Sequence, residues 1–361
     1  MIKIDPLTDA RWQAFVCAHP HGSVYHHPAW IQALTAEYGQ PAEHLACEGS
    51  GGELLAILPL LRTRGLPFGI GGPLLGPRLA SLPRTPIAGP LSVDKDATAA
   101  VVSEALRLAR LTPGVGLQIK TSSQELDGLV DGLAYTPWRF TYILQLPDKS
   151  STPFRIADSS ERTKIKWAVN KAAKLGVTVR LAETEKDLRD WYRIYLDTAR
   201  RSMVPPRSLR FFAAIWNAFR GSGMMDLLLA EHGPAAHRKI VAGSIFLFFG
   251  KTASYSFSAM DRNHASLRAN DALLWHAINT ASARGFRVFD FGEVPDGHDA
   301  LAKFKMKWGA DPQRLHRYYS PAPRSSVSHD HSDSRTLAAA TWRALPLKLT
   351  EWIGDQIYRF L

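Results

Sequence analysis

The sequence predicts an α/β protein made of two similar modules, each a mixed central sheet flanked by helices. In the second half of the chain, strand-like runs and amphipathic helical segments follow the order β-α-α-β-β-β-α-β-α-β. The first half repeats this order more faintly, at an offset of about 175 residues, which suggests a duplicated fold. A chain of 361 residues is also long for one core and comfortable for two domains.

Capping residues and alternation define the elements of the second half. Gly176 is a typical residue after a helix C-terminus, and Thr184 and Ser208 are typical N-caps. The predicted helices are Glu161–Leu175, a segment after Thr184, a segment after Ser208, Asn270–Arg284 and a short segment at Asp299–Trp308. The predicted strands are Val177–Leu181, Met224–Glu231, Lys239–Phe249, Thr252–Ala259, Phe286–Phe291 and Arg314–Tyr319.

The first half contains weaker signals of the same kinds. Its predicted strands are Ile2–Ile4, His44–Glu48, Leu54–Arg62, a stretch near Phe68–Leu75, Gly116–Thr121 and Phe140–Leu146. Its predicted helices are Thr8–Ala18, Pro28–Tyr38, Asp94–Leu111 and Ser123–Leu133. We therefore expect one module at residues 1–150 and a second at 160–320.

Two further segments follow the modules. Residues 321–335 are polar and are predicted to be a linker. Residues 336–361 carry apolar side chains at helical spacing and predict an amphipathic helix: Trp342, Leu345, Leu349, Trp352, Ile353, Ile357 and Phe360. Such a helix either contacts an anionic membrane surface or packs back onto the body. The pattern leaves both open.

Composition limits the class and the location of the protein. Hydrophobic residues make up 45% and charged residues 21%, as in ordinary globular proteins. The two cysteines predict neither a disulfide framework nor a paired-cysteine metal site, and the N-terminus lacks a signal-peptide pattern. The spacing of His19, His21, His26 and His27 fits no standard zinc pattern, so no metal is expected. A cytoplasmic location is predicted, and the oligomeric state stays open.

The net charge of +11 is concentrated in two segments. Residues 161–220 hold 14 Lys and Arg against 6 Asp and Glu, and residues 301–320 hold 5 against 1. A local positive field attracts phosphates, whether of a nucleotide, coenzyme A, tRNA or a lipid. A solvated basic face without a partner accounts for the same charge.

Three strings resemble one family. The segment SVYHHPAWIQALTAEYG at Ser23–Gly39 has an aromatic-Pro-x-Trp entry into a helix, and TKIKWAVNKAAKLGVTV at Thr163–Val179 is a basic helix leading to a strand. RVFDFGE at Arg287–Glu293, followed by KFKMKWGADP at Lys303–Pro312, is the most specific of the three. With the element order, they resemble the FemAB-like acyl and aminoacyltransferases of the GNAT superfamily over residues 1–320.

The resemblance implies transfer of an acyl or aminoacyl group to an amine, with no tightly bound cofactor. Fem-type enzymes take amino acids from aminoacyl-tRNA and attach them to peptidoglycan precursors, and relatives are associated with exopolysaccharide export. The acceptor would be a small-molecule or lipid-linked envelope precursor. The donor, acyl-CoA or aminoacyl-tRNA, stays open, because the usual glycine-containing coenzyme A loop is absent from Arg262–Asn270.

The same resemblance suggests where the chemistry takes place. Lys305 resembles the family lysine near the reacting centre, where an ammonium stabilises the oxyanion of a tetrahedral intermediate. Asp290 and Glu293, at the end of a predicted strand, would orient or deprotonate the amine. The other predicted substrate-binding residues are Trp30, Tyr255, Ser258, Lys303 and Lys307. Each also has a plain structural interpretation, as a core aromatic, a sheet residue or a surface lysine.

Two alternative functions fit the sequence. One is an acyl-CoA-dependent N-acyltransferase that acts on an amino sugar or an amino acid. The other is a non-catalytic, basic nucleic-acid-binding protein, which the charge favours but for which no recognised nucleic-acid-binding motif is present.

Overall fold

The computed structural model describes residues 1–66, 76–147, 156–234, 237–323 and 340–361. The chain divides into two compact units. Unit 1 consists of Met1–Arg139, Arg314–Ser332 and Asp355–Leu361, and unit 2 of Phe140–Gln313 and Asp333–Gly354. The strand β8 (Ala134–Gln145) and the strand β14 (Asp311–Ser320) each contribute residues to both units.

Unit 1 contains an antiparallel sheet in the order β1-β2-β3-β6 and a mixed set of strands in the order β4-β5-β7-β14. In the second set, β5 and β7 are parallel, and β14 pairs with β7 in the antiparallel sense. The strands are β1 (Ile2–Lys3), β2 (Leu45–Glu48), β3 (Leu54–Leu58), β4 (Leu61–Thr63), β5 (Arg78–Ala80), β6 (Leu91–Ser92) and β7 (Gly116–Thr121).

The helices of unit 1 are α1 (Ala10–Ala18), α2 (Pro28–Tyr38) and α3 (Lys95–Arg110). The helix α3 begins at the N-cap Asp94, whose carboxylate accepts a hydrogen bond from the Ala97 N–H. Its apolar face, with Val101 and Ala105 fully buried, packs on β3 and β7 and forms the core of the unit. This burial supplies the main stabilisation of the unit.

The sheet of unit 2 has the strand order β8-β13-β12-β11-β10-β9. Only the pair β12/β13 is parallel among the pairings described for these strands. The strands are β9 (Thr178–Leu181), β10 (Met225–His232), β11 (Lys239–Phe249), β12 (Thr252–Met260) and β13 (Val288–Val294). The helices are α4 (Ser159–Lys174), α5 (Glu185–Arg201), α6 (Leu209–Phe219), α7 (Ala269–Ala283) and α8 (Asp299–Met306).

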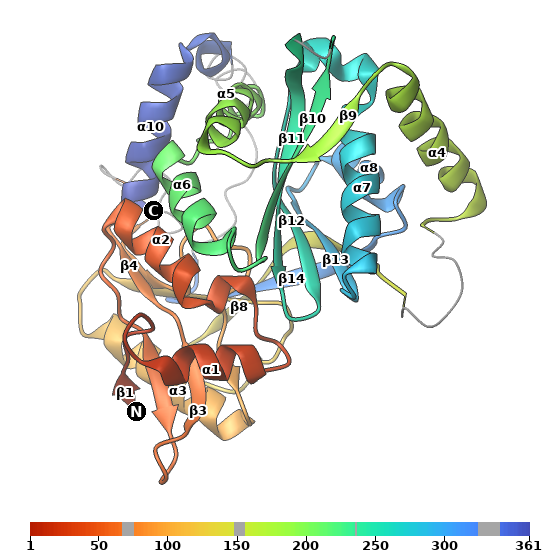
Figure 1. The fold of residues 1–361 in the computed structure, drawn as a ribbon. Coiled ribbons are helices and arrows are strands. Elements are labelled where there is room, and N and C mark those ends of the chain that lie inside the picture. The colour runs from red at the N-terminus through yellow and green to blue at the C-terminus, as the bar shows by residue number, and fades with distance from the viewer. Residues whose placement is uncertain (67–75, 148–155, 235–236, 324–339) are drawn as a thin grey trace. The chain divides into compact units, whose positions relative to one another are not determined.

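Helices cover both faces of this sheet (Figure 1). On one face, α4 packs against α7, and both contribute to the core of the unit. On the other face, Trp191 of α5 is fully buried and donates from Nε1 to the Gly243 carbonyl at 3.0 Å. A Cβ at Gly243 would lie 2.5 Å from the Trp191 ring, so glycine is what lets the helix approach the strand.

These observations confirm the predicted α/β class with mixed sheets flanked by helices. The predicted caps Thr184 and Ser208 are also confirmed, and Thr184 forms a capping box with Asp187. The two-module boundaries stay a prediction. The stretch near Phe68–Leu75 and most of the predicted linker at 321–335 lie outside the described residues.

Two predicted elements of the first half are wrong. Residues 123–133 form a series of turns rather than a helix. Gly128 and Gly132 have φ values of +67° and +91°, which a helix does not allow. The predicted strand Leu54–Arg62 is two strands, β3 and β4, in different strand sets. Pro59, which lies between them, has no N–H to donate to a ladder.

The C-terminal helix α10 (Leu347–Phe360) packs through a face that differs from the predicted apolar stripe. Its buried positions are Thr350, Gly354 and Tyr358, spaced four residues apart. In unit 2, Glu351 accepts a hydrogen bond from the Tyr192 hydroxyl at 3.0 Å. In unit 1, Tyr358 stacks on Tyr38 with ring centroids 5.5 Å apart. No helix in the described part of the chain is long and apolar enough to cross a membrane.

The contact at Gly354 gives a test of this packing. A Cβ at Gly354 would lie 2.3 Å from the Pro206 carbonyl oxygen, so the backbone would have to move. We expect Gly354→Ala to lower the free energy of unfolding by about 1–3 kcal/mol, as overpacking does. The loss should occur although alanine favours helix by about 1 kcal/mol.

The measurement is thermal unfolding, with Gly221→Ala as the matched control. A Cβ at Gly221 meets nothing within 4 Å. An unfolding temperature of Gly354→Ala equal to or above that of the wild type would contradict the packing of α10 on Pro206.

Candidate active site

The parallel strands β12 and β13 pair over a short stretch only. Their register joins Thr252 to Val288, Ala253 to Phe289 and Ser254 to Asp290, and pairing ends there. Beyond this point β12 continues to Met260 and β13 to Val294. Along these ends the backbone groups of β12 and β13 do not pair with each other.

A β-bulge lies in β13 directly after this point. Asp290 is opposite Ile143 of β8 and Glu293 is opposite Thr141, so two residues of β13 face Tyr142 alone. Gly292, one of the two, has a φ of +77°, a conformation that favours glycine. Bulges of this kind interrupt the ladder and redirect the strand, and they are over-represented beside active sites.

Lys305 reaches the bulge from α8. It is the buried residue of that helix, with 4% of its surface exposed. Its Nζ donates to the carbonyl of Gly292 at 2.7 Å and to that of Glu293 at 3.1 Å. An ammonium group has three N–H donors, and the third has no acceptor among the residues that the structure describes.

Burial lowers the pKa of Lys305 to about 8, and the nearby charges of Asp290 and Glu293 oppose this shift. At neutral pH the side chain is therefore mainly an ammonium in a poorly solvated position. Such a group interacts more strongly with a developing negative charge than a solvated lysine does.

Asp290 holds the bulge from the other side. Its Oδ1 accepts a hydrogen bond from the Thr141 hydroxyl at 2.5 Å and one from the Gly292 N–H at 2.8 Å. Burial raises the pKa of Asp290, whereas these two hydrogen bonds and the charge of Lys305 lower it. Lys305, Asp290 and Glu293 therefore meet at one bulge, as residues of one small site.

Tyr255 and Ser258 are on β12, next to the end of its pairing with β13. The Ser244 hydroxyl donates to that of Ser258 at 3.2 Å. Burial raises the pKa of Tyr255, and side-chain hydrogen bonds with Ser258 and Ser244 oppose this. A register shift between β11 and β12 at Ser256 turns Tyr255 and Ser258 to the same face of the sheet. The result is a cluster of hydroxyl groups beside the parted strands.

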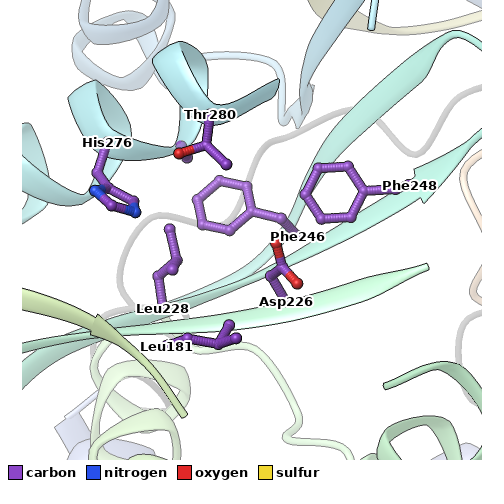
Figure 2. A pocket seen from close by; sticks show the side chains of 8 residues that line it. Leu181, Asp226, Leu228, Phe246, Phe248, His276 and Thr280 are labelled. Atoms are coloured by element: carbon purple, nitrogen blue, oxygen red, sulfur yellow. The ribbon is translucent and has the colours of Figure 1, made fainter. Parts of the chain in front are cut away.

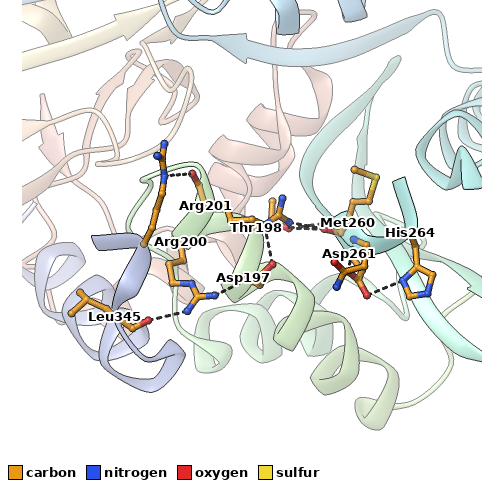
Figure 3. Close-up of polar contacts among 10 residues, drawn as sticks. Asp197, Thr198, Arg200, Arg201, Met260, Asp261, His264 and Leu345 are labelled. Atoms are coloured by element: carbon orange, nitrogen blue, oxygen red, sulfur yellow. Dashed lines mark hydrogen bonds and ion pairs between the residues drawn. The ribbon is translucent and has the colours of Figure 1, made fainter. Parts of the chain in front are cut away.

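Helix α5 fixes the end of β12, as Figure 3 shows. Arg201 donates from Nη2 to the Met260 carbonyl at 2.7 Å, and the Met260 N–H donates to Thr198 at 3.2 Å. Asp261 then begins a short 3-10 helix, η5 (Arg262–Leu267), and its carboxylate contacts the His264 ring at 2.9 Å. These contacts set the path from β12 to the start of α7.

The other predicted site residues lie in different surroundings. Lys303 is exposed on α8. Lys307 is half-buried and forms an ion pair of 2.6 Å with Asp271 in the first turn of α7. Trp30 belongs to unit 1, is 1% exposed and donates from Nε1 to Thr85 at 3.3 Å. This burial is what a core anchor requires, and a role of Trp30 in acceptor binding stays a prediction.

Two hollows are present in unit 2. The smaller has a volume of about 130 Å³, and its lining comes mainly from hydrocarbon side chains, with Asp226 and His276 at its border (Figure 2). The larger, of about 460 Å³, is lined by Thr163, Lys164, Trp167, Ala168, Arg268, Asp271 and Lys307. Only the larger reaches the volume of typical small-molecule sites.

One residue of the larger hollow is close in sequence to Lys305. Lys307, which lines it, follows Lys305 by two positions. The charge of Asp271, also in its lining, adds to the burial that raises the pKa of Tyr255. Among the described residues, no group of three or more His, Cys, Asp or Glu side chains is arranged to hold a metal ion.

Sequence reasoning did not single out Thr141, Ser244, Trp167 or the backbone of Gly292 as site components. A signal was present for one of them, since a glycine inside a strand often marks a bulge. The other three depend on contacts between distant parts of the chain, and Thr141 is 149 residues from Asp290.

Part of the chain matches a known protein family. Residues 159–306 match the family described as an acetyltransferase (GNAT) domain. Several solved structures have a similar fold. A structure of FemX has a TM-score of 0.64 and 17% identity, over 88% of this chain and 97% of that chain. No curated protein sequence matches this chain.

Two further similar structures are described as lysylphosphatidylglycerol synthetase and L-PGS. The C-terminal domain of one from Agrobacterium fabrum has a TM-score of 0.55 and 13% identity, over 92% of this chain and 95% of that chain. L-PGS from Bacillus licheniformis has a TM-score of 0.52 and 15% identity, over 87% and 96%. At these identities the similarity establishes a shared fold.

Proposed function

We propose that this chain transfers an acyl or aminoacyl group to an amine of a cell-envelope precursor, since its residues 159–306 match an acetyltransferase (GNAT) domain and its fold is similar to that of FemX. The observation that carries the proposal is Lys305, a buried ammonium beside parted strands with one N–H uncommitted among the described residues. Acyl transfer requires such a donor where the carbonyl oxygen gains charge.

In the proposed reaction, the donor carbonyl lies between the ends of β12 and β13, where backbone groups can align it. The acceptor amine attacks the carbonyl carbon, and the new C–N bond gives a tetrahedral oxyanion that Lys305 stabilises. The C–S bond of a thioester or the C–O bond of an ester then breaks. The amine proton passes to the leaving thiolate or alkoxide, for which the hydroxyls of Tyr255 and Ser258 offer a route.

Asp290 and Glu293 are proposed to orient the amine and to accept its proton before the proton passes to the leaving group. Asp290 has a second function as a positioning residue, because its hydrogen bonds to Thr141 and Gly292 hold the bulge to which Lys305 binds. The proposal predicts that Thr141→Val lowers kcat by roughly 3- to 10-fold, the loss of about one hydrogen bond.

The measurement for Thr141→Val is steady-state kinetics, with Thr280→Val as control. Thr280 lies in the smaller hollow, away from the bulge residues. Equal kinetics of both variants would contradict a role of the Thr141–Asp290 hydrogen bond in positioning Lys305.

The envelope assignment rests on the similarity to these solved structures and on the family resemblance of the segments Arg287–Glu293 and Lys303–Pro312. FemX-type and lysylphosphatidylglycerol synthetase folds accord with a lipid-linked or peptidoglycan precursor as acceptor, aminoacyl-tRNA as donor, and work at the cytoplasmic side of the membrane. Leu349 and Trp352 of α10 are 40% and 60% exposed, and we propose them as the contact with an anionic membrane.

A second candidate is favoured by the domain match itself. GNAT acetyltransferase domains use acyl-CoA, so an acyl-CoA-dependent N-acyltransferase of an amino sugar or amino acid uses the same site with a different donor and acceptor. Parallel assays with acetyl-CoA and with aminoacyl-tRNA distinguish the two. Amide product from acetyl-CoA alone would replace the aminoacyl assignment.

A further inference from the structure

The strands β5, β7 and β14 of unit 1 carry basic and polar side chains on one face. Their other face is apolar, and its residues Leu79, Leu117 and Tyr318 belong to the core that includes α3. Because side chains alternate along a strand, the neighbouring residues point away from this core. These neighbours are Arg78, Gln118, Lys120, Arg317 and Tyr319. The cations among them are buried, although they lie outside the apolar core.

Arg78 has a donor without a partner. Its side chain is 9% exposed, and its Nε donates to the Gly76 carbonyl at 3.1 Å. Its Nη2 is also buried and makes no hydrogen bond with any residue that the structure describes. Burial lowers the pKa of Arg78, the charge of Tyr319 opposes this shift, and the charge of Arg84 adds to it. A buried guanidinium next to a second cation is unfavourable, so an anion bound to it would stabilise the fold.

A strained turn at residues 81–85 holds that second cation. Leu82 and Arg84 have φ values of +51° and +56°, which residues other than glycine rarely adopt. The buried Lys120 fixes the turn, since its Nζ donates to the Leu82 carbonyl. Backbone strain that the surrounding structure maintains in this way is concentrated at ligand-binding and catalytic sites. The turn keeps Arg84 where its charge acts on Arg78, although like charges repel.

Tyr319 adds a neutral donor to the two arginines. Its hydroxyl accepts a hydrogen bond from Gln118 Nε2 at 3.0 Å, and its own hydrogen has no acceptor within the described part of the chain. The Arg84 guanidinium lies over the Tyr358 ring, 5.5 Å from the centroid, so its N–H groups point sideways from the stack. Two guanidinium groups and a hydroxyl are donors suited to a tetrahedral oxyanion.

We propose that Arg78 and Arg84, together with the Tyr319 hydroxyl, bind an anion of the phosphate class in unit 1. The proposal goes beyond the acyl transfer, because Lys305 belongs to unit 2. Arg78 is buried and Arg84 is exposed, so the ligand is a small oxyanion or the terminal phosphate of a larger molecule. Free phosphate and the phosphomonoester headgroup of a lipid share this chemistry, and the experiment distinguishes them.

The test measures binding to the full chain by isothermal titration calorimetry, with inorganic phosphate and dihexanoyl phosphatidic acid as probes. At least one probe should bind. Arg78→Gln and Arg84→Gln should each raise its Kd roughly 10- to 150-fold, the loss of one charge-assisted hydrogen bond. Equal Kd values of the two probes identify free phosphate as sufficient, and a lower Kd of the lipid identifies the headgroup.

Thermal unfolding gives a second readout, which does not depend on the affinity of a weakened variant. A ligand that binds the folded state raises the unfolding temperature. Phosphate also stabilises proteins in general, so the wild type is compared with Arg78→Met at the same phosphate concentrations. The rise should be larger in the wild type, because methionine keeps much of the apolar stem and removes the cation. An equal rise in both proteins would contradict the site.

Two variants serve as controls for the titrations. Arg107→Gln removes an exposed arginine of α3 in the same unit and should leave the Kd within about twofold. Lys305→Met should also bind the probe like the wild type, so that a loss of turnover and a loss of anion binding are separate results. The proposal is overturned if neither probe binds at millimolar concentration, or if Arg78→Gln and Arg84→Gln behave like Arg107→Gln.

Discussion

Lys305→Met is expected to lower turnover by roughly 10²–10³-fold, the usual effect of removing one oxyanion donor. An ammonium stabilises the tetrahedral oxyanion more than the neutral carbonyl of the bound donor, and only this difference lowers the barrier. Methionine keeps most of the length of the side chain and removes the charge. KM for the donor should therefore change little, and kcat should carry the loss.

The variant also removes the hydrogen bonds to the carbonyls of Gly292 and Glu293. Leaving a buried acceptor unsatisfied lowers stability by about 1–3 kcal/mol, so kcat must be measured well below the unfolding temperature of the variant. Two variants serve as controls for Lys305→Met. Thr141→Val changes the same bulge and leaves the Lys305 side chain in place. Lys303→Met removes an exposed lysine of the same helix. Equal losses in Lys305→Met and Thr141→Val would reduce Lys305 to a support of the bulge.

The second large effect concerns pH. We expect kcat to fall as pH rises through about 8, the pKa of Lys305, because the ammonium form is the donor. The direction of this pH dependence follows from the lowered pKa of Lys305. Burial lowers this pKa from its ordinary value, so the proton leaves near pH 8 instead of above 10.

Two variants identify the group responsible for this decline. The negative charge of Asp290 raises the pKa of Lys305, so Asp290→Asn should move the decline to lower pH. Lys305→Arg keeps the charge throughout the range and should remove the decline, even at a reduced rate. A wild-type kcat that rises through pH 8 to a plateau, unchanged in shape by Lys305→Arg, would assign the neutral amine or another group to this step.

Local sequence signals were sufficient to predict most of the helices and strands of unit 2. Thr184 and Ser208 are N-caps, and β11 has the predicted bounds Lys239–Phe249, because capping and alternation depend on neighbouring residues. The turns at 123–133 were missed because periodicity does not reveal the left-handed conformations of Gly128 and Gly132. The buried face of α10 was also missed, since Gly354 packs on Pro206 through the absence of a side chain.

The residues of the proposed site could be chosen from the sequence, but their arrangement could not. The family resemblance of Arg287–Glu293 and Lys303–Pro312 indicates Lys305, Asp290 and Glu293 as candidates. It did not indicate that Lys305 donates to backbone carbonyls or that Asp290 accepts from Thr141, because both contacts arise from the bulge opposite Tyr142. The sequence pattern places Trp167 in a basic helix but does not predict that its side chain is exposed, because this exposure depends on how α4 packs against α7.

The most direct test of the account is mass spectrometry of the acceptor after incubation with the wild-type protein. The donors are acetyl-CoA and aminoacyl-tRNA, each combined with an amine-bearing peptidoglycan precursor and with an amino sugar. The account predicts that one pair gains the mass of the acyl or aminoacyl group at the amine, and that Lys305→Met abolishes this gain. No product from any pair, together with salt-sensitive and sequence-independent RNA binding, would contradict catalysis and favour a nucleic-acid-binding protein.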